Sequence, residues 1–436
     1  MIINSTLVSL NEGEHTVRFF DYDGTILAER KVYTGQSAIA PTPPTIAGLD
    51  FVEWNNAFTN IQADLDVGAT RKTTDGKTHA FVRVTVPTGL DVTLFLNKSD
   101  GSTLTVDWGD GSTPDTFTDT GNFNTGAHTY AAVGDYEITL DITTGSGTYE
   151  FGNGSAITTF VGGNTQKQRE QLISLWVGNS ADVTSIGGNA FRDCFALTSI
   201  VIPSGITSIG GSAFRSCLAL TSIVIPSGVT SIGGSAFLDC RALASIVIPS
   251  GVTSIGGNVF RDCRALTSIV VPAGIDSIEA DAFRDCGALT SIVISSGVTS
   301  IGESAFQDCR ALTSIVIPAD VTSIGTNAFR NCFALTSIVI PSGITSIGVD
   351  VFRDCRALTS IVIPSGVTSI GGSAFLDCRA IKSYEVLATV PPTLADVNAF
   401  TGILASTKIF VPAASVDAYK AATNWITYAD YIHPLA

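Results

Sequence analysis

Apolar residues recur at a fixed interval along the second half of the chain. All nine cysteines fall in this region, and each is separated from the next by 23 residues, from Cys194 to Cys378. A phenylalanine precedes each cysteine by three positions, and a leucine or isoleucine follows it by three. The repeated unit reads A-F-R-D-C-R-A-L-T-S-I-V-I-P-S-G-V-T-S-I-G-G-S. A period of about 20–50 residues is typical of solenoids and propellers, and this one is too short for a propeller blade.

The unit itself predicts two short strands. L-T-S-I-V-I is β-branched and alternating, which indicates a strand, and the proline after it ends the ladder. V-T-S-I is a second extended segment, and G-S-A-F-R-D-C-R-A is expected to form a single helical or 3₁₀ turn. One unit offers about six apolar side chains, too few to offset a backbone entropy cost of about 1–2 kcal/mol per residue. Stacked copies bury each other's faces, so we expect one continuous solenoid of nine to ten turns.

The spacing L-x-x-I-x-I, with the Phe-x-x-Cys-x-x-Leu, Ile-Pro and Ile-Gly landmarks, resembles the BspA-type leucine-rich repeat. The resemblance covers residues 172–436 and implies a leucine-rich-repeat solenoid over 172–381 with a C-terminal cap over 382–436. Residues 172–187 look like a degenerate first turn. In the C-terminal cap, Ser415 is expected to N-cap a short helix that runs to Trp425.

The front of the chain lacks the repeat and alternates like β structure. Residues 1–72 contain a D-G turn between two apolar runs, a Pro-rich loop and Phe-x-x-Trp, and they resemble the internalin-B-type repeat. Residues 73–150 contain V-D-W-G-D-G-S and H-T-Y-A-A-V-G-D-Y-E-I-T-L, a pairing similar to the polycystic-kidney-disease-type β-sandwich. With 151–171 as a linker, the expected fold class is mainly β: a solenoid of 23-residue units preceded by two small β domains.

Charge narrows the classes of partner. Charged residues make up 14% of the chain, against roughly 25% in an average globular protein. The net charge is −15, and residues 1–160 carry −12 of it, with 20 acidic and 8 basic side chains. An acidic front half argues against nucleic acid and against anionic lipid surfaces. The sequence also lacks an apolar run long enough to cross a membrane and a basic, apolar leader, so neither membrane insertion nor a signal peptide is expected.

Two motifs suggest chemistry that their surroundings do not support. Asp21-Tyr22-Asp23-Gly24-Thr25 matches the nucleophile motif of haloacid-dehalogenase-type phosphatases, but that chemistry needs a doubly wound α/β sheet. A D-G hairpin turn is the favoured interpretation. A second group consists of four aspartates around Trp108. Loop carboxylates of this kind can hold Ca²⁺, yet the spacing is not that of an EF-hand, and solvated turn residues are favoured. The four are Asp107, Asp110, Asp115 and Asp119.

The cysteines and the charges beside them have structural interpretations as well. The cysteine count is odd and the spacing uniform, so buried free thiols are favoured over disulfides, although neighbouring rungs would be close enough to bridge. Each unit carries an Arg/Asp group around its cysteine, such as Arg261-Asp262-Cys263-Arg264. This group is either an anion- or glycan-binding ridge or, as we favour, a solvated edge of balanced charge. No metal, cofactor or catalytic residue is predicted.

The strand supplies the candidate binding surface. If Leu, Ile and Ile of L-T-S-I-V-I point inward, the serine, valine and proline between them point outward. Valine fills the outward position in eight copies, and an exposed apolar strip of that length usually marks a binding face. The alternative is plain β-propensity in an invariant repeat. The candidate ligand-binding residues are Val201, Val224, Val247, Val270, Val293, Val316, Val339 and Val362.

The sequence therefore predicts a non-enzymatic recognition or adhesion protein. Its solenoid would bind a cell-surface or matrix ligand, a host or cell-surface protein or glycan, with the N-terminal modules acting as spacer or attachment. The alternative is a virion structural protein, such as a phage tail or head-decoration component, that contacts other virion proteins and displays the solenoid for host or mucus attachment. Both place the protein on an extracellular surface, that of a cell or of a virion.

Overall fold

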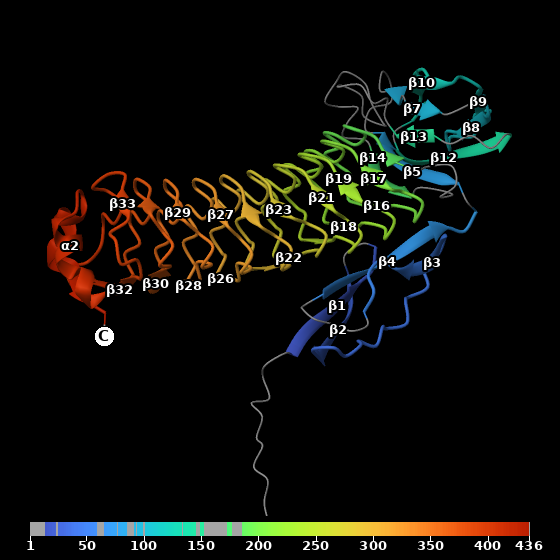
Figure 1. Ribbon diagram of the computed structural model, residues 1–436. Helices are drawn as coiled ribbons and strands as arrows, with labels where there is room; N and C mark the ends of the chain where they lie inside the picture. The colour runs from blue at the N-terminus through green and yellow to red at the C-terminus, as the bar shows by residue number, and fades with distance from the viewer. Residues whose placement is uncertain are drawn as a thin grey trace, which may run out of the picture.

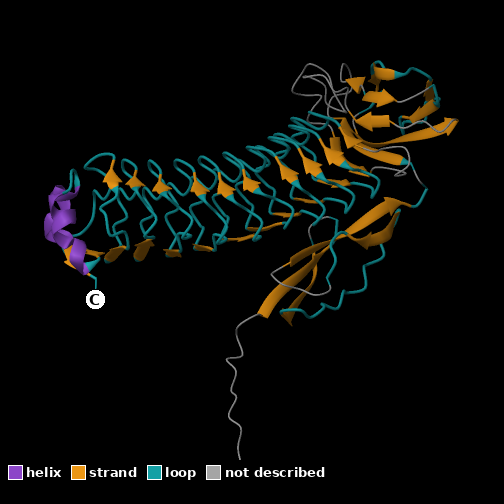
Figure 2. Cartoon of the chain, viewed as in Figure 1, coloured by secondary structure: helices purple, strands orange, loops and turns teal. Residues whose placement is uncertain are grey.

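The computed structural model describes residues 14–22, 25–58, 65–75, 77–84, 91–92, 94–98, 101–132, 134–144, 149–151, 172–176 and 185–435. Figure 1 shows a long solenoid with two β modules at its N-terminal end and a helical cap at its C-terminal end. The expected fold class is confirmed: strands and turns build nearly all of the described chain, and helix is confined to the C-terminal cap (Figure 2).

Each turn of the solenoid contributes one strand to each of two parallel sheets. The first sheet consists of β14 (Leu172–Trp176), β16 (Ser199–Val201), β18 (Ser222–Val224), β20 (Ser245–Val247), β22 (Ser268–Val271), β24 (Ser291–Ile294), β26 (Ser314–Ile315), β28 (Ser337–Ile338), β30 (Ser360–Ile363), β32 (Ser383–Val386) and β34 (Lys408–Val411). The second consists of β15 (Ser185–Ile186), β17 (Ser208–Ile209), β19 (Ser231–Ile232), β21 (Ser254–Ile255), β23 (Ser277–Ile278), β25 (Ser300–Ile301), β27 (Ser323–Ile324), β29 (Ser346–Ile347), β31 (Ser369–Ile370) and β33 (Thr393–Leu394). These are eleven rungs, more than the nine to ten expected, because β14, β32 and β34 from the two ends also join the stack. The cap strand β35 (Ile432–Pro434) pairs parallel with β34 and extends the sheet once more.

The register repeats with the sequence. Strands pair residue for residue with the copy 23 positions on, as in Ser222 with Ser245 and Val224 with Val247. The phenylalanines stack on one another through the interior, with ring centroids 5.2–5.6 Å apart from Phe191 to Phe375. Phe400 extends the stack into the C-terminal cap at 5.4 Å. One apolar column therefore runs through the whole solenoid.

The segment around each cysteine is a run of tight turns, and the expected helical or 3₁₀ turn is not formed. Two residues per unit adopt left-handed backbone, as Ser235 at φ 60° and Asp239 at φ 63° do. Asn, Asp and Ser occupy these positions in every copy from Asn189 to Asp377. Short polar side chains tolerate this conformation better than β-branched ones. The backbone N–H groups then bond across rungs, as from Phe237 to the carbonyl of Val259 at 2.9 Å.

One glycine column is needed where neighbouring rungs touch. A Cβ added to Gly233 would lie 2.5 Å from the backbone nitrogen of Gly211 in the preceding rung, closer than real side chains approach. Gly210 and Gly256 meet the same obstacle at 2.4 Å. The Ile-Gly landmark of the repeat therefore reflects close packing of backbone on backbone.

The second module extends both sheets of the solenoid. Its strands are β5 (Thr78–Val84), β6 (Asp91–Val92), β7 (Phe95–Lys98), β8 (Thr103–Asp107), β9 (Asp115–Phe117), β10 (Gly121–Asn124), β11 (His128–Thr129), β12 (Gly134–Thr144) and β13 (Tyr149–Phe151). Strand β5 pairs with β14 of the first sheet, and β13 pairs with β15 of the second. Buried residues of the module, including Trp108 and Tyr130, belong to the same apolar core as the solenoid. The module thus closes the N-terminal end of the stack; the predicted linker, apart from Phe151, lies in residues 152–171, outside the described residues.

The first module has a small core of its own. Its strands β1 (Glu14–Phe20), β2 (Ile26–Tyr33), β3 (Leu49–Trp54) and β4 (Leu65–Thr73) form a sheet in the order β2-β1-β4-β3. Val17, Phe19, Val32, Ala38 and Val67 are buried together in it. This core is separate from that of the solenoid, so the module is a distinct unit attached by the short segment between β4 and β5.

The C-terminal cap is built from η1 (Ala413–Ser415), α2 (Val416–Ala421), η2 (Trp425–Tyr431) and β35 (Ile432–Pro434). Ser415 does precede a helix, but its side chain makes no cap; its hydroxyl donates to the carbonyl of Thr389 at 2.7 Å. The helix also ends at Ala421, before Trp425. Buried Tyr419 and Trp425 donate to carbonyls of the preceding turn at 2.7 Å and so hold the cap on the solenoid. No helix in the described residues is long and apolar enough to cross a membrane.

Candidate ligand-binding surface

The outward surface of the first sheet, here called the strand face, carries the predicted valines. The strand alternation places isoleucines in the core and serine and valine outside it, as expected. Exposure, however, differs sharply along the column. Val316 and Val339 are 80% and 77% exposed and Val362 is 44% exposed, whereas Val201, Val224 and Val247 are exposed by only 2–6%. Val270 and Val293 are half-buried.

The first module covers the N-terminal half of the strand face, which corrects the expectation of one continuous exposed strip. Its strand β4 packs across β16, β18, β20 and β22 (Figure 1). Phe20 of β1 is 4% exposed although it lies outside the module's own core, and the Arg18 guanidinium lies 5.6 Å from the centre of its ring. The covered half therefore comprises Val201, Val224, Val247 and Val270, and the free half comprises Val316, Val339 and Val362. Val293 is half-buried and lies at the boundary between the two halves.

Side chains of the module bond to the backbone and hydroxyl groups of successive rungs. The Asn55 amide donates to the carbonyl of Ile225 at 2.9 Å, and the Asn56 amide donates to that of Ile248 at 3.4 Å. Asn56 also accepts from the Ser250 N–H at 2.7 Å. Both asparagines are almost fully buried, so these bonds satisfy polar groups that would otherwise be costly to bury.

Two further contacts fix the edges of the docked module. Arg18 donates to the Ser268 hydroxyl at 2.9 Å, and the Ser227 hydroxyl donates to the Glu53 carboxylate at 2.5 Å. These hydrogen bonds reach from Ser227 to Ser268, and the contacts of β4 extend the covered region back to β16. Sequence reasoning missed this docking, because the repeat looks the same in the covered and free halves and Trp54-Asn55-Asn56 carries no recognisable motif.

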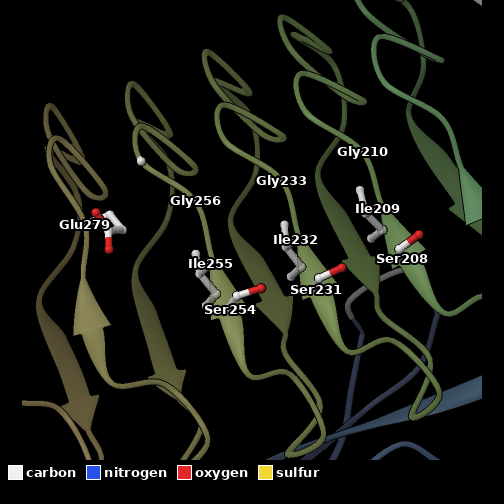
Figure 3. A pocket seen from close by; sticks show the side chains of 11 residues that line it. Ser208, Ile209, Gly210, Ser231, Ile232, Gly233, Ser254, Ile255, Gly256 and Glu279 are labelled. Atoms are coloured by element: carbon white, nitrogen blue, oxygen red, sulfur yellow. The ribbon is translucent and has the colours of Figure 1, made fainter. Parts of the chain in front are cut away.

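The second sheet carries a shallow open depression of about 680 Å³. Ser208, Ser231 and Ser254 lie side by side along it on successive rungs (Figure 3). Gly210, Gly233 and Gly256 also line the depression and add no side chains to it. Glu279 occupies the equivalent position of the next rung and lies at one end of the depression. The Ser277 hydroxyl donates to that carboxylate at 2.8 Å.

The charged groups beside the cysteines form ion pairs within most rungs, and Arg330 pairs instead with Asp350 of the next rung at 4.0 Å. The arginine after the cysteine meets the aspartate before it, as in Arg241–Asp239 at 2.7 Å and Arg356–Asp354 at 2.7 Å. These arginine side chains are more than half exposed, so each pair contributes only about 0–1 kcal/mol. Asp285 lacks this arginine because Gly287 replaces it; burial and the neighbouring Asp262 and Asp308 raise its pKa. Most charges beside the cysteines are therefore paired, and this edge of the solenoid has little net charge, as expected for a solvated edge.

The cysteines are free and buried in all nine copies, as predicted. Most thiols donate to the phenylalanine carbonyl of the preceding rung, as Cys240 does to Phe214 at 3.0 Å and Cys355 does to Phe329 at 3.2 Å. Burial raises the pKa of the Cys378 thiol to about 12. Each thiol therefore acts as a small apolar filler that also satisfies one carbonyl.

The aspartates around Trp108 are engaged in local hydrogen bonds. Asp107 accepts from the N–H of Gly109 at 2.9 Å, and Asp115 accepts from the Trp108 indole at 2.8 Å. Asp110 accepts from the Ser112 N–H at 3.0 Å and pairs with His128 at 2.9 Å. The Ser112 and His128 hydrogen bonds lower the pKa of Asp110 to about 2. Over the described residues, no three potential metal ligands cluster, whether here or at Asp119.

The phosphatase-like motif lies in a hairpin, as predicted. Strands β1 and β2 pair antiparallel from Glu14–Tyr33 to Phe20–Ile26. Asp21 is 4% exposed, and its carboxylate accepts from the N–H of Tyr22 at 2.8 Å. Asp23 and Gly24 of the motif lie outside the described residues.

Comparison with known proteins supports the repeat assignment. Residues 172–289 and 276–403 match the BspA type leucine rich repeat region, and together they span just over half of the chain. The chain therefore belongs to the BspA-type leucine-rich repeat family. A search of curated proteins gave no match.

Several solved structures share the repeat. A leucine-rich repeat protein from Bacteroides ovatus is 22% identical over 58% of this chain and 82% of its own, with a TM-score of 0.40. A protein from Faecalibacterium prausnitzii, described as a leucine rich cell surface protein, is 23% identical over 66% and 89%, with a TM-score of 0.39. The leucine rich repeat protein of T. pallidum is 30% identical over 40% and 72%, with a TM-score of 0.30. At these TM-scores the superpositions are partial, and the fold assignment rests on the repeat itself.

Proposed function

We propose that this protein is a non-enzymatic recognition protein that binds a ligand on a cell surface or in the matrix through the free half of its strand face. The observation that carries the proposal is a row of outward valines in three successive rungs. Val316 and Val339 directly follow β26 and β28 and are more than three-quarters exposed, and Val362 lies within β30. Contiguous exposed apolar side chains on a flat sheet are typical of binding surfaces. One solved structure with this repeat is described as a leucine rich cell surface protein, which supports an extracellular location for this chain as well.

The covered half supports the same proposal from within the molecule. There the equivalent valines of earlier rungs already contact another unit of the chain, and Val201, Val224 and Val247 are almost fully buried. This contact within the chain supports the proposal that the free half also binds a partner. The virion alternative gains no observation from the structure and stays a prediction from sequence.

The test is a triple substitution of Val316, Val339 and Val362 by lysine, assayed on an array of purified extracellular-matrix proteins and glycans. Wild-type chain is expected to bind at least one member of the array, and the triple variant is expected to lose that signal. The matched control places three lysines in the same turns on the second sheet, at Ser323, Ser346 and Ser369. If the control loses binding and the valine variant keeps it, the second sheet is the binding surface and the proposal is wrong.

A further inference from the structure

The free half of the strand face repeats the site that holds the first module. A shift of four repeats, or four times 23 residues, carries Val224 to Val316 and Val247 to Val339. The same shift carries the two carbonyls bonded by Asn55 and Asn56, those of Ile225 and Ile248, to Ile317 and Ile340. It carries Ser250 to Ser342 and Ser268 to Ser360, and the one exception is Ser227, which becomes Ala319.

The shifted site is unoccupied on this chain. No hydrogen-bond donor meets the Ile317 or Ile340 carbonyl within the described residues, whereas both equivalents in the covered half accept asparagine amides. The valines beside them are the most exposed of the column. A row of carbonyl acceptors between exposed valines is complementary to a partner with amide donors set in an apolar surface.

The chain's own module cannot move to the shifted site. Strand β4 ends at Thr73 and β5 begins at Thr78, and five residue steps reach about 18 Å when fully extended. Four rungs at about 4.8 Å each require a shift of about 19 Å, and β4 runs toward the second module, away from the free half (Figure 1). The occupant must therefore come from another molecule.

A second copy of the chain is a poor candidate for that molecule. Its module is tethered beside its own covered half, and a short tether gives an effective concentration on the order of millimolar. A module of a second copy would give up one site to gain an equivalent one. The favoured occupant is thus a module that has no such site on its own chain.

We infer that the free half binds a polypeptide: a β module of another protein that presents two consecutive side-chain amides, in the manner of Asn55 and Asn56, flanked by apolar residues. The amides bond the Ile317 and Ile340 carbonyls, one of them also accepts from the Ser342 N–H, and the apolar residues cover Val316 and Val339. This inference rests on the proposed function and assigns the class of its ligand as protein.

The experiment supplies the known module from a second full-length chain. In the donor, Val224, Val247, Val316 and Val339 are all replaced by lysine, so its module is released and has no site on its own solenoid. Release is verified with Val201→Cys on the donor, because that thiol reacts with a maleimide only when the module has left. The acceptor is the wild-type chain carrying Val339→Cys, whose maleimide labelling reports coverage of the free half against nine buried native thiols.

Excess donor is expected to form a one-to-one complex with the acceptor and to slow labelling at position 339 by about ten-fold at ten times the dissociation constant. A donor that also carries Asn55→Asp and Asn56→Asp is expected to give no protection, because carboxylates cannot donate to the two carbonyls. Unchanged labelling with a verified released module would overturn the inference. Loss of array binding in the Val316, Val339 and Val362 lysine variant would still uphold the proposed function, and the array member that binds the wild-type chain would identify the ligand.

Measuring self-association tests whether a second copy of the chain occupies the free half. Wild-type chain is expected to stay monomeric by light scattering at concentrations well below the effective concentration of its own tether. A dimer that is lost in the Val316, Val339 and Val362 lysine variant would mean that the free half binds a second copy, and the assignment to another protein would be wrong.

Discussion

The covered and free halves of the strand face have nearly the same sequence and opposite surroundings. Val224 and Val316 stand at equivalent positions of the repeat, yet one is 6% exposed and the other 80%. The rungs around both residues pair in the same parallel register, although Val224 lies within β18 and Val316 directly follows the last residue of β26. Exposure in a repeat protein is therefore set by what docks on it, and near-identity of copies does not mean equivalence of function.

The difference stops at the surface, because the interior is the same in both halves. The largest loss of stability is therefore expected from a substitution in the core, at the boundary between the covered and free halves. Phe260 stacks on Phe237 at 5.6 Å and on Phe283 at 5.5 Å, and it is fully buried. Phe260→Ala should lower the free energy of unfolding by about 3–5 kcal/mol, since it leaves a cavity between two rings. Urea denaturation followed by circular dichroism measures this.

The control for that change is Phe329→Ala in the free half. It removes an equally stacked ring, with neighbours at 5.4 and 5.6 Å, and should cost a similar amount. A much smaller loss at Phe329 than at Phe260 would show that the docked module contributes to the core energetics, and the picture of a uniform interior would fail.

The second prediction separates the halves directly. Val224→Lys puts an unpaired ammonium beneath the docked module and should cost about 1–3 kcal/mol of docking free energy, because a buried polar group without a partner is unfavourable. Val316→Lys should change stability by less than about 0.5 kcal/mol, because its side chain is in water. Limited proteolysis within the first module is the measurement, and only Val224→Lys should accelerate it. Equal protection of both variants would mean that the module does not depend on the valine column.

The same contrast shows what the sequence could predict. The 23-residue period, the inward and outward alternation and the buried free cysteines were all visible, because each copy repeats the same local signal. The docking of the first module was not, because it depends on Asn55 and Asn56 meeting carbonyls 170 and 192 positions away. Nothing in a repeat marks which of its copies will be covered. The turn around each cysteine was misjudged for a related reason: its left-handed residues, such as Asp239, are stabilised by bonds to the next rung and not by local helix formation.

A smaller effect is expected in the second module, which closes the stack beside the covered half. Hydrogen bonds from Ser112 and then His128 lower the pKa of Asp110 from 3.8 to about 2 in the folded state. A lowered folded pKa means that the ionised carboxylate stabilises the fold above pH 4, and that this contribution is lost as the pH falls from 4 toward 2. Asp110→Asn should remove about 1 kcal/mol at pH 7 and flatten the acid limb of the stability curve. Thermal melts at pH 2, 4 and 7 measure both; an unchanged acid limb in Asp110→Asn would argue against the assignment.

The last prediction expects no difference between the halves. All nine thiols are buried, and burial raises the pKa of the thiols of Cys309 and Cys378, the latter to about 12. Thiolate is the reactive form, so at pH 8 neither exposure nor ionisation favours reaction. In the folded chain no cysteine should be modified by a maleimide, and all nine should react in denaturant, as mass spectrometry of the labelled chain would show. Removing the module with Val224→Lys and Val247→Lys should leave this result unchanged, because the thiols lie in the interior and not beneath the docked unit. Labelling of Cys217 or Cys240 in that variant alone would show that the module holds the covered rungs together, and the two halves would then differ in their cores as well as on their surfaces.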